Sequence, residues 1–170
     1  LAQRAAGSLL TRIHGDLHLG QVLVAHDDAY IIDFEGEPAR PLAERRAKDC
    51  PLRDVAGMLR SFDYAGAKLD EAAAGKASDE SAVEIAHGVA ERYLLASRRA
   101  FLEAYWQSAA DIAHRWTARE GAAAALELFV LEKTAYEIAY EAANRPAWLG
   151  VPLRGLAAIV DQLSTRGAHD

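Results

Sequence analysis

The chain has little of several features on which whole classes of protein depend. Cys50 is the only cysteine in 170 residues, so no internal disulfide is possible. Neither a signal peptide nor an apolar run of membrane-spanning length is present. The formal charge of −6 argues against a surface for nucleic acid, which would need clustered Lys and Arg. We therefore expect a soluble, cytoplasmic protein that binds neither nucleic acid nor membrane.

The composition does favour one hydrophobic core. About half of the residues (51%) are apolar, which in a chain of this length suffices for one folded unit and not obviously for two. We expect residues 1–170 to form a single unit.

The most informative residues lie in two stretches near the amino terminus, Arg12–Gln21 and Tyr30–Glu37. Each acidic loop residue, Asp16 and Asp33, stands beside a β-prone apolar run. Phosphoryl transfer from a metal-bound nucleotide requires this kind of arrangement. Asp16 would accept the proton of the attacking hydroxyl, and Gln21 and Asp33 would hold the Mg²⁺ that accompanies ATP. The pattern predicts half of a kinase active site.

A β-hairpin is expected to bring the two metal-binding residues together. The runs 21–25 and 29–34 are rich in β-prone residues, and residues 26–29 supply turn formers. Gln21 enters the first strand where Asp33 leaves the second, so antiparallel pairing places them side by side.

The rest of the chain is predicted to be mainly helical. Residues 34–51 have no sustained period and are expected to be irregular, whereas a helix begins at Leu52 with Gly66 as its stop. Residues 68–81, poor in large apolar side chains, predict a mobile connection. Further helices are expected at about 80–110, 121–144 and 152–164. The first has Ile85, Val89, Tyr93, Ala96 and Ala100 on one side, a stripe that needs a partner to bury it. The predicted fold class is mainly α with a small β-hairpin.

One helical face in 121–144 has a composition suited to a sugar. Six residues fall at helical spacing on that face: Lys133, Tyr136, Glu137, Tyr140, Glu141 and Asn144. Phenol rings stack on the apolar faces of a sugar, and charged groups bond its hydroxyls. A partly buried helix with surface ion pairs would give the same pattern.

These stretches also resemble a known family. His14–Gln21 with Ile32–Pro38 is similar to the catalytic core of aminoglycoside-phosphotransferase-like kinases, and Gln21 with the Asn144–Trp148 string resembles the bacterial maltokinases. Cys50–Tyr64 and the strings from Glu132 to Leu153 add to the likeness. The resemblance implies the carboxy-terminal lobe of a protein-kinase-like fold. It also implies a sugar kinase that uses ATP and Mg²⁺ to phosphorylate maltose.

The same resemblance implies roles for individual residues. Asp16 matches the catalytic aspartate, and Gln21 with Asp33 matches the metal pair. Asp54 matches a helix aspartate that supports the catalytic loop, which His14 also braces. Glu35 is a possible addition to the acidic site. The candidates for binding the sugar are Lys133, Tyr136, Tyr140, Arg145 and Trp148.

The chain departs from that family at its amino terminus. No Gly-x-Gly-x-x-Gly occurs, and residues 1–11 are too short for the nucleotide-binding lobe with its lysine. We expect this lobe to be missing and the isolated chain to be inactive or nearly so. The expected organisation is a loop and metal hairpin over 12–37 with a helical subdomain over 51–165.

Other functions remain open. A non-catalytic module that docks a fused or associated trehalose synthase need not retain Asp16, Gln21 and Asp33 together. A phosphotransferase for aminoglycosides or other small alcohols would keep the chemistry and change the acceptor, and an acidic pocket would favour the cationic drug. His14 and His18 have the spacing of a zinc pair but lie in a loop and lack the helical Glu of a zinc protease.

Overall fold

Helices account for most of the chain, with one two-stranded sheet. The computed structural model describes residues 3, 6–75, 79–112 and 119–167. Its elements in chain order are η1 (Leu19–Gln21), β1 (Val22–Ala25), β2 (Asp28–Ile31), α1 (Leu42–Arg46), α2 (Leu52–Ala74), α3 (Glu80–Ala109), α4 (Arg119–Asn144), η3 (Pro146–Trp148) and α5 (Gly150–Gly167). The expected fold class, mainly α with a small hairpin, is confirmed.

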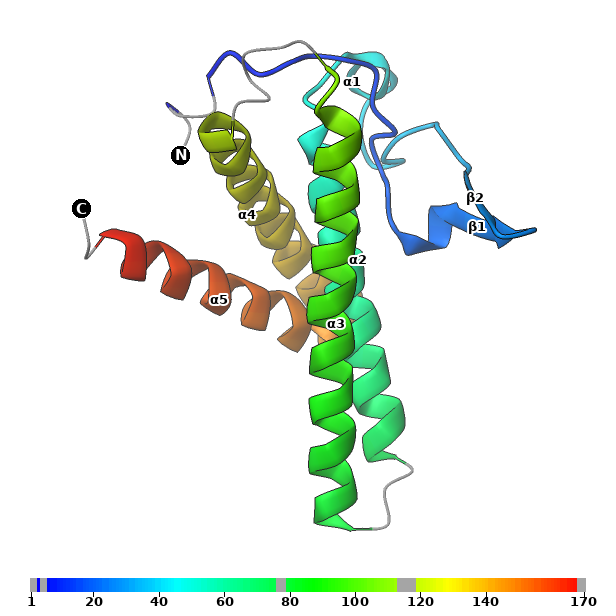
Figure 1. The fold of residues 1–170 in the computed structure, drawn as a ribbon, viewed down its shortest axis with the longest axis vertical. Coiled ribbons are helices and arrows are strands. Elements are labelled where there is room, and N and C mark those ends of the chain that lie inside the picture. Colours follow the sequence, from blue (N-terminus) through cyan, green and yellow to red (C-terminus); the bar gives the residue numbers. More distant parts are fainter. Residues whose placement is uncertain (1–2, 4–5, 76–78, 113–118, 168–170) are drawn as a thin grey trace.

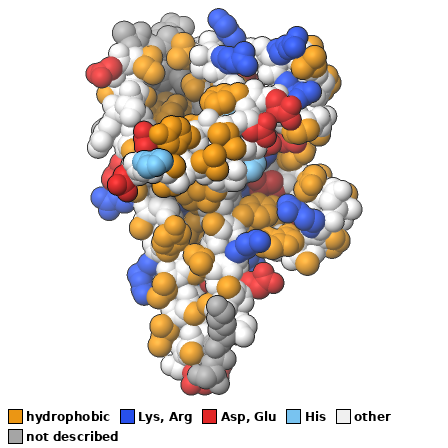
Figure 2. Space-filling view, turned by 90° about the vertical axis from the view of Figure 1, so that its right-hand side faces the viewer, with side chains coloured by type: hydrophobic (Ala, Val, Ile, Leu, Met, Phe, Trp, Pro, Cys, Tyr) orange, Lys and Arg blue, Asp and Glu red, His pale blue; other side chains and the backbone are white. Residues whose placement is uncertain are grey.

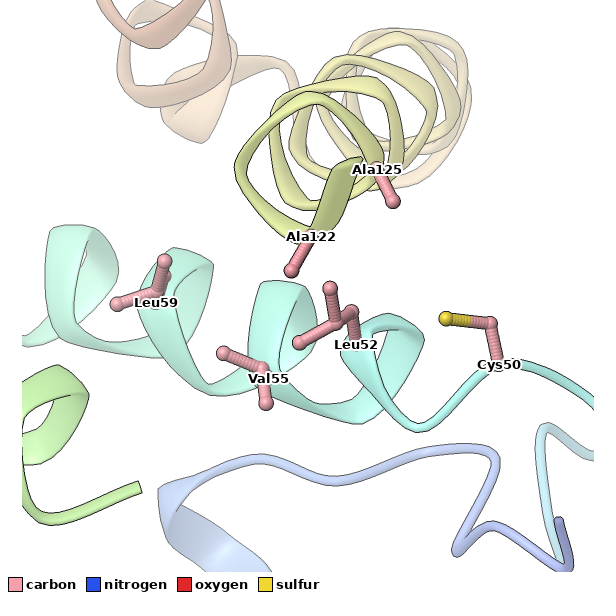
Figure 3. Close-up of a cluster of buried hydrophobic side chains, with 6 residues drawn as sticks. All are labelled: Cys50, Leu52, Val55, Leu59, Ala122 and Ala125. Atoms are coloured by element: carbon pink, nitrogen blue, oxygen red, sulfur yellow. The ribbon is translucent and has the colours of Figure 1, made fainter. Parts of the chain in front are cut away.

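Helix α2 is the central element of the fold. It packs against α3 along its length and against α4, while α5 contacts α4 and projects away from the hairpin (Figure 1). The buried cluster beneath this packing joins the start of α2 to α4 (Figure 3). Its members are Cys50, Leu52, Val55, Leu59, Ala122 and Ala125. Alanines on α4 let the two helices approach closely, and the first turns of α2 are buried in this contact.

The hairpin forms where the sequence predicts it. β1 and β2 are antiparallel with Val22 opposite Ile31 and Ala25 opposite Asp28. His26 and Asp27 have positive φ angles of 53° and 61°, the backbone that a tight hairpin turn requires. The second strand ends at Ile31 and not at residue 34, because Asp33 adopts a left-handed φ of 64° that breaks extended backbone.

Most hairpin side chains are exposed, since the sheet has only two strands. Figure 2 views the side of the molecule on which the hairpin lies, and hydrophobic side chains gather there. Leu23, Val24, Tyr30 and Ile31 are all exposed. The hairpin is held instead at its open end, here called its root, where Gln21 and Ile32 meet the loop that carries Asp16.

Two expectations between residues 62 and 81 are wrong. Gly66 does not end α2, which continues to Ala74. A Cβ at Gly66 would lie 3.4 Å from the Leu94 side chain, so this glycine sits where α3 packs closely. Residues 68–74 are helical and not a mobile connection, because an alanine-rich run with Leu69 favours helix even without a large apolar stripe. Residues 76–78 of that segment lie outside the described residues.

Two further differences concern the segment 34–51 and the exposed side of α3. The segment 34–51 is largely irregular but contains the short helix α1, and its Asp49 forms an isolated β-bridge with Thr11. Ile85 and Tyr93, whose helical spacing predicts a buried stripe on α3, are exposed, while Ala90 and Leu94 face the bundle. Within the described ranges, no helix is both long and apolar enough to cross a membrane.

Candidate active site

The loop that carries Asp16 is fixed to the first turn of α2 by Asp54. One carboxylate oxygen of Asp54 accepts the backbone N–H of His14 at 2.7 Å, and the other accepts that of Gly15 at 2.9 Å. Burial raises the pKa of Asp54, an effect opposed by these two N–H groups. Two hydrogen bonds across about forty residues of sequence set the loop's position relative to the helix.

Gly57 lets the same helix approach the loop more closely than another residue would. A Cβ at this position would lie 2.6 Å from the backbone oxygen of Leu17, which directly follows Asp16. Gly15 has a φ of 86° and faces the Cα of Gly36, where a Cβ would come within 3.2 Å. Loop, helix and the segment after β2 therefore meet at backbone contact, which leaves Asp16 little freedom to move.

The His14 ring links the loop to the hairpin. Its Nε2 lies 2.7 Å from the carbonyl oxygen of Ile32, and its Nδ1 lies 3.2 Å from the backbone nitrogen of Asp16. A carbonyl can only accept and a backbone N–H can only donate, so Nε2 is the donor and Nδ1 the acceptor in these two contacts. The ring is buried and lies 4.9 Å from the Phe34 ring. The two hydrogen bonds tie the backbone at Asp16 to Ile32, which follows β2 and precedes Asp33.

Gln21 and Asp33 lie side by side at the root of the hairpin. The Gln21 Nε2 donates to an Asp33 carboxylate oxygen at 3.1 Å, and the N–H of Ile32 donates to the carbonyl of Gln21 at 3.0 Å. Backbone pairing thus continues one step beyond the named strands. An amide oxygen and a carboxylate are hard donors of the kind that Mg²⁺ prefers, so the pair fits that ion. Among the described residues, no group of three or more His, Cys, Asp and Glu is placed to hold a metal.

Asp16 lies in a small pocket with side chains from α4 and from the segment after β2. The pocket has a volume of about 50 Å³ and is lined by Asp16, Glu37, Glu132, Lys133 and Tyr136 among others. The Lys133 ammonium lies 3.9 Å from an Asp16 oxygen and 3.8 Å from a Glu37 oxygen. Burial and the nearby Glu37 carboxylate raise the pKa of Asp16, and Lys133 opposes them. A raised pKa suits a group that must take up a proton.

Two of the predicted sugar-binding residues, Tyr136 and Tyr140, are stacked on the outer side of α4. Their ring centroids are 6.2 Å apart with an interplanar angle of 24°, and both side chains are partly exposed. The Lys133 ammonium lies 5.3 Å from the Tyr136 ring. The phenol pair therefore forms an aromatic surface that continues outward from the pocket.

Arg145 and Trp148 are not brought into this pocket. Arg145 binds the buried Glu141 through two nitrogens at 2.6 and 2.9 Å. Trp148 stacks on Tyr64 with ring centroids 6.1 Å apart. The hydroxyl of Tyr64 in turn donates to Glu141 at 2.9 Å, so these residues belong to a separate cluster that joins α2, α4 and η3.

Glu137, which belongs to the same predicted helical face, also lies away from the pocket. Glu137 is buried and binds the Arg60 Nε at 2.8 Å, which places it between α4 and α2. Burial raises the pKa of Glu137, and Arg60 opposes that effect. Glu35 lies outside the pocket, with its carboxylate 3.8 Å from Arg45 and 62% of its side chain exposed.

Glu37 lines the pocket although sequence analysis assigned it no role. It follows Asp33 within the acidic stretch, but the sequence offers no sign that it meets Lys133. Arg53 also lines the pocket, and it binds Glu132 and Asp49 at 2.7 Å each. The segment after β2 brings Glu37 to Lys133, and the packing of α2 on α4 brings Arg53 to Glu132.

Comparison with known proteins finds glucosamine kinases among both the sequence relatives and the solved structures. No family model matches the chain. A glucosamine kinase from Mycolicibacterium smegmatis is 33% identical over 153 residues, which cover 88% of this chain and 34% of the relative. A glucosamine kinase from Streptacidiphilus jiangxiensis is 33% identical over 100 residues, which cover 59% of this chain and 21% of the relative. The chain spans about a third or less of the length of these relatives.

Solved structures agree with the sequence relatives. One crystal form of a glucosamine kinase superposes with a TM-score of 0.66 at 26% identity, covering 90% of this chain and 35% of the other. A glucosamine kinase in complex with glucosamine, ADP and inorganic phosphate gives a TM-score of 0.59 at 26% identity, with 94% and 36% covered.

These findings overturn the resemblance to maltokinases. The relatives and solved structures are named glucosamine kinase, so the expected acceptor, maltose, is wrong. A trehalose synthase partner has no support, and neither alternative reading, a docking module or an aminoglycoside-type phosphotransferase, matches these relatives.

Proposed function

We propose that the protein containing this chain is an ATP-dependent kinase that phosphorylates an aminosugar of the glucosamine type. The observation that carries the proposal is the position of Asp16, held by α2 in a small pocket beside Glu37 and Lys133. Glucosamine kinases resemble the chain in sequence and in structure, and one of them is bound to glucosamine, ADP and phosphate. Because the chain spans about a third of these relatives, the activity is proposed for the full-length protein.

We propose that Asp16 acts as the base in the transfer. A sugar hydroxyl gives its proton to the Asp16 carboxylate while its oxygen forms a bond to the γ-phosphorus of ATP. The bond from that phosphorus to the bridging oxygen breaks, and ADP leaves. The anchors at Asp54 and Gly57 keep the carboxylate in place, so little reorganisation is needed at the moment of transfer.

Gln21 and Asp33 are proposed to hold Mg²⁺, which would neutralise charge on the transferred phosphate. The Tyr136 and Tyr140 rings are proposed to stack on the apolar face of the sugar, next to the pocket that receives its reacting end. Arg145 and Trp148 are proposed to stabilise the end of α4 and not to bind the acceptor directly, because they pair with Glu141 and Tyr64.

The chain is proposed to be the carboxy-terminal lobe of a kinase-like fold. The loop and hairpin over 12–37 would supply the base and the metal pair, and the helices over 51–165 would supply the acceptor surface. The Asp54 anchor joins these parts at their root, which supports a single unit.

A coupled assay of ADP release by the full-length protein tests the proposal. The acceptors are glucosamine, glucose, N-acetylglucosamine and maltose, each at the same concentration. We expect the highest kcat/KM with glucosamine and loss of turnover in Asp16→Asn, whose amide cannot accept the proton. Turnover with maltose and none with glucosamine would contradict the proposed acceptor.

A further inference from the structure

The charges around Asp16 do not balance. Asp16 and Glu37 carry two negative charges, and the Lys133 ammonium between them carries one positive charge. Both separations, 3.9 and 3.8 Å, are longer than a direct hydrogen bond of about 2.7–3.2 Å. Lys133 therefore attracts both carboxylates without using up their capacity to accept hydrogen bonds, and one negative charge remains.

The neighbouring charges are engaged with one another. Arg53 binds Glu132 and Asp49 at 2.7 Å each, and Arg40 lies 3.9 Å from the same Glu132. These two arginines thus offset the charges of Glu132 and Asp49, and Asp54, which also lines the pocket, accepts the N–H groups of His14 and Gly15. Glu37 has its ion pair with Lys133, which it shares with Asp16.

The pocket also has the right size for a small cationic group. The space open to the centre of a water-sized sphere is about 50 Å³, which exceeds the roughly 10–15 Å³ that one water needs on the same measure. The Lys133 side chain lines this space and does not fill it. This lysine has a second favourable contact, since its nitrogen lies 5.3 Å from the Tyr136 ring, so its charge stays stabilised when another cation binds the carboxylates.

We propose that Glu37 is the residue that determines specificity for an aminosugar: its carboxylate binds the ammonium group of the acceptor while Asp16 receives the proton of the reacting hydroxyl. The inference rests on the proposed function. A neutral hydroxyl in the place of the ammonium would leave the extra negative charge uncompensated, so the site favours a cationic acceptor over glucose. The carboxylate of Glu37 lies close enough to share a cation with Asp16, and its own segment packs against the loop at Gly15 and Gly36.

The test compares kcat/KM for glucosamine and for glucose in the full-length protein. Glu37→Gln keeps the shape of the side chain and removes its charge. We expect kcat/KM for glucosamine to fall about 10- to 100-fold, as for loss of a hydrogen bond to a charged group. The change should appear mainly in KM, and kcat/KM for glucose should not fall, because the uncompensated negative charge that disfavours a neutral acceptor is removed. Glu44→Gln, an exposed position on α1, removes the same charge outside the pocket and should leave both values unchanged.

The outcomes separate the inference from the proposed function. If the wild-type protein does not phosphorylate glucosamine, the proposed function is wrong, and the inference fails with it. If the wild-type protein does so and Glu37→Gln lowers both acceptors equally or neither, only the inference is wrong. The wild-type protein supplies a second readout that depends on no variant. Its preference for glucosamine over glucose should decline as alkaline pH removes the proton of the amine, and a constant preference would overturn the role of the ammonium.

Discussion

Gly57 is the point at which the packing of α2 controls the position of the base. In Gly57→Ala the new Cβ would lie 2.6 Å from the carbonyl oxygen of Leu17, the residue after Asp16. Carbon and carbonyl oxygen normally approach to about 3.3–3.6 Å in such contacts. The oxygen belongs to the backbone and cannot rotate away, so the loop must move by several tenths of an ångström or the helix must shift.

A second glycine in a helix supplies a matched control. Gly88 lies within α3, and a Cβ there would meet only the end of the Arg92 side chain at 3.6 Å. Replacing either glycine by alanine gains about 1 kcal/mol of helix propensity. Only Gly57→Ala adds overpacking, which costs about 1–3 kcal/mol. The propensity cancels between the two variants, so Gly88→Ala should exceed Gly57→Ala in free energy of unfolding by about 1–3 kcal/mol.

Urea unfolding followed by circular dichroism measures this difference, and the two variants should share the same m-value. In the full-length protein Gly57→Ala should also lower kcat, because the displaced Leu17 carries Asp16 with it, whereas Gly88→Ala should not. A Gly57→Ala protein as stable as Gly88→Ala would refute the claim that α2 holds the loop through this contact.

Three further predictions concern the same site. Asp54→Ala leaves two loop N–H groups without an acceptor and should lower the free energy of unfolding by about 2–4 kcal/mol, measured by urea titration. The pKa of Asp16 is raised in the folded protein, so the folded state binds more protons than the unfolded one, and stability falls as pH rises from the ordinary pKa through the raised one. Asp16→Asn should therefore abolish that fall and be more stable than the wild type at pH 7, as melting temperatures across pH would show. Gln21→Ala removes one oxygen donor beside Asp33 and should increase the Mg²⁺ concentration needed for half-maximal turnover about tenfold or more, while the melting temperature stays unchanged.

Local sequence patterns predicted which helices and strands form better than they predicted the residues at which these end. The hairpin and the long helices follow from β-prone runs and from apolar spacing, and the placement of Gln21 beside Asp33 follows from antiparallel pairing alone. The end of β2 depends on the left-handed backbone at Asp33, which no periodicity reports. Gly66 resembles a helix stop in sequence, but the packing of α3 explains it.

The composition of the pocket was harder to predict, because it depends on contacts between distant segments. Glu37 gains its position only when the chain after β2 packs against α4 near Lys133. Glu137 and Glu141 have the same helical spacing as Tyr136 and Tyr140, yet they turn towards α2 and become buried. Spacing alone does not say which edge of a helical face a neighbouring helix covers.

The central claim is that Asp16 takes the proton of an aminosugar hydroxyl in transfer from ATP. The most direct measurement is ³¹P NMR of the full-length protein with ATP and glucosamine, in the wild type and in Asp16→Asn. We predict a new phosphomonoester signal that grows in step with ADP in the wild type and is absent from a folded Asp16→Asn variant. Phosphorylated glucosamine formed at an undiminished rate by Asp16→Asn would contradict the account.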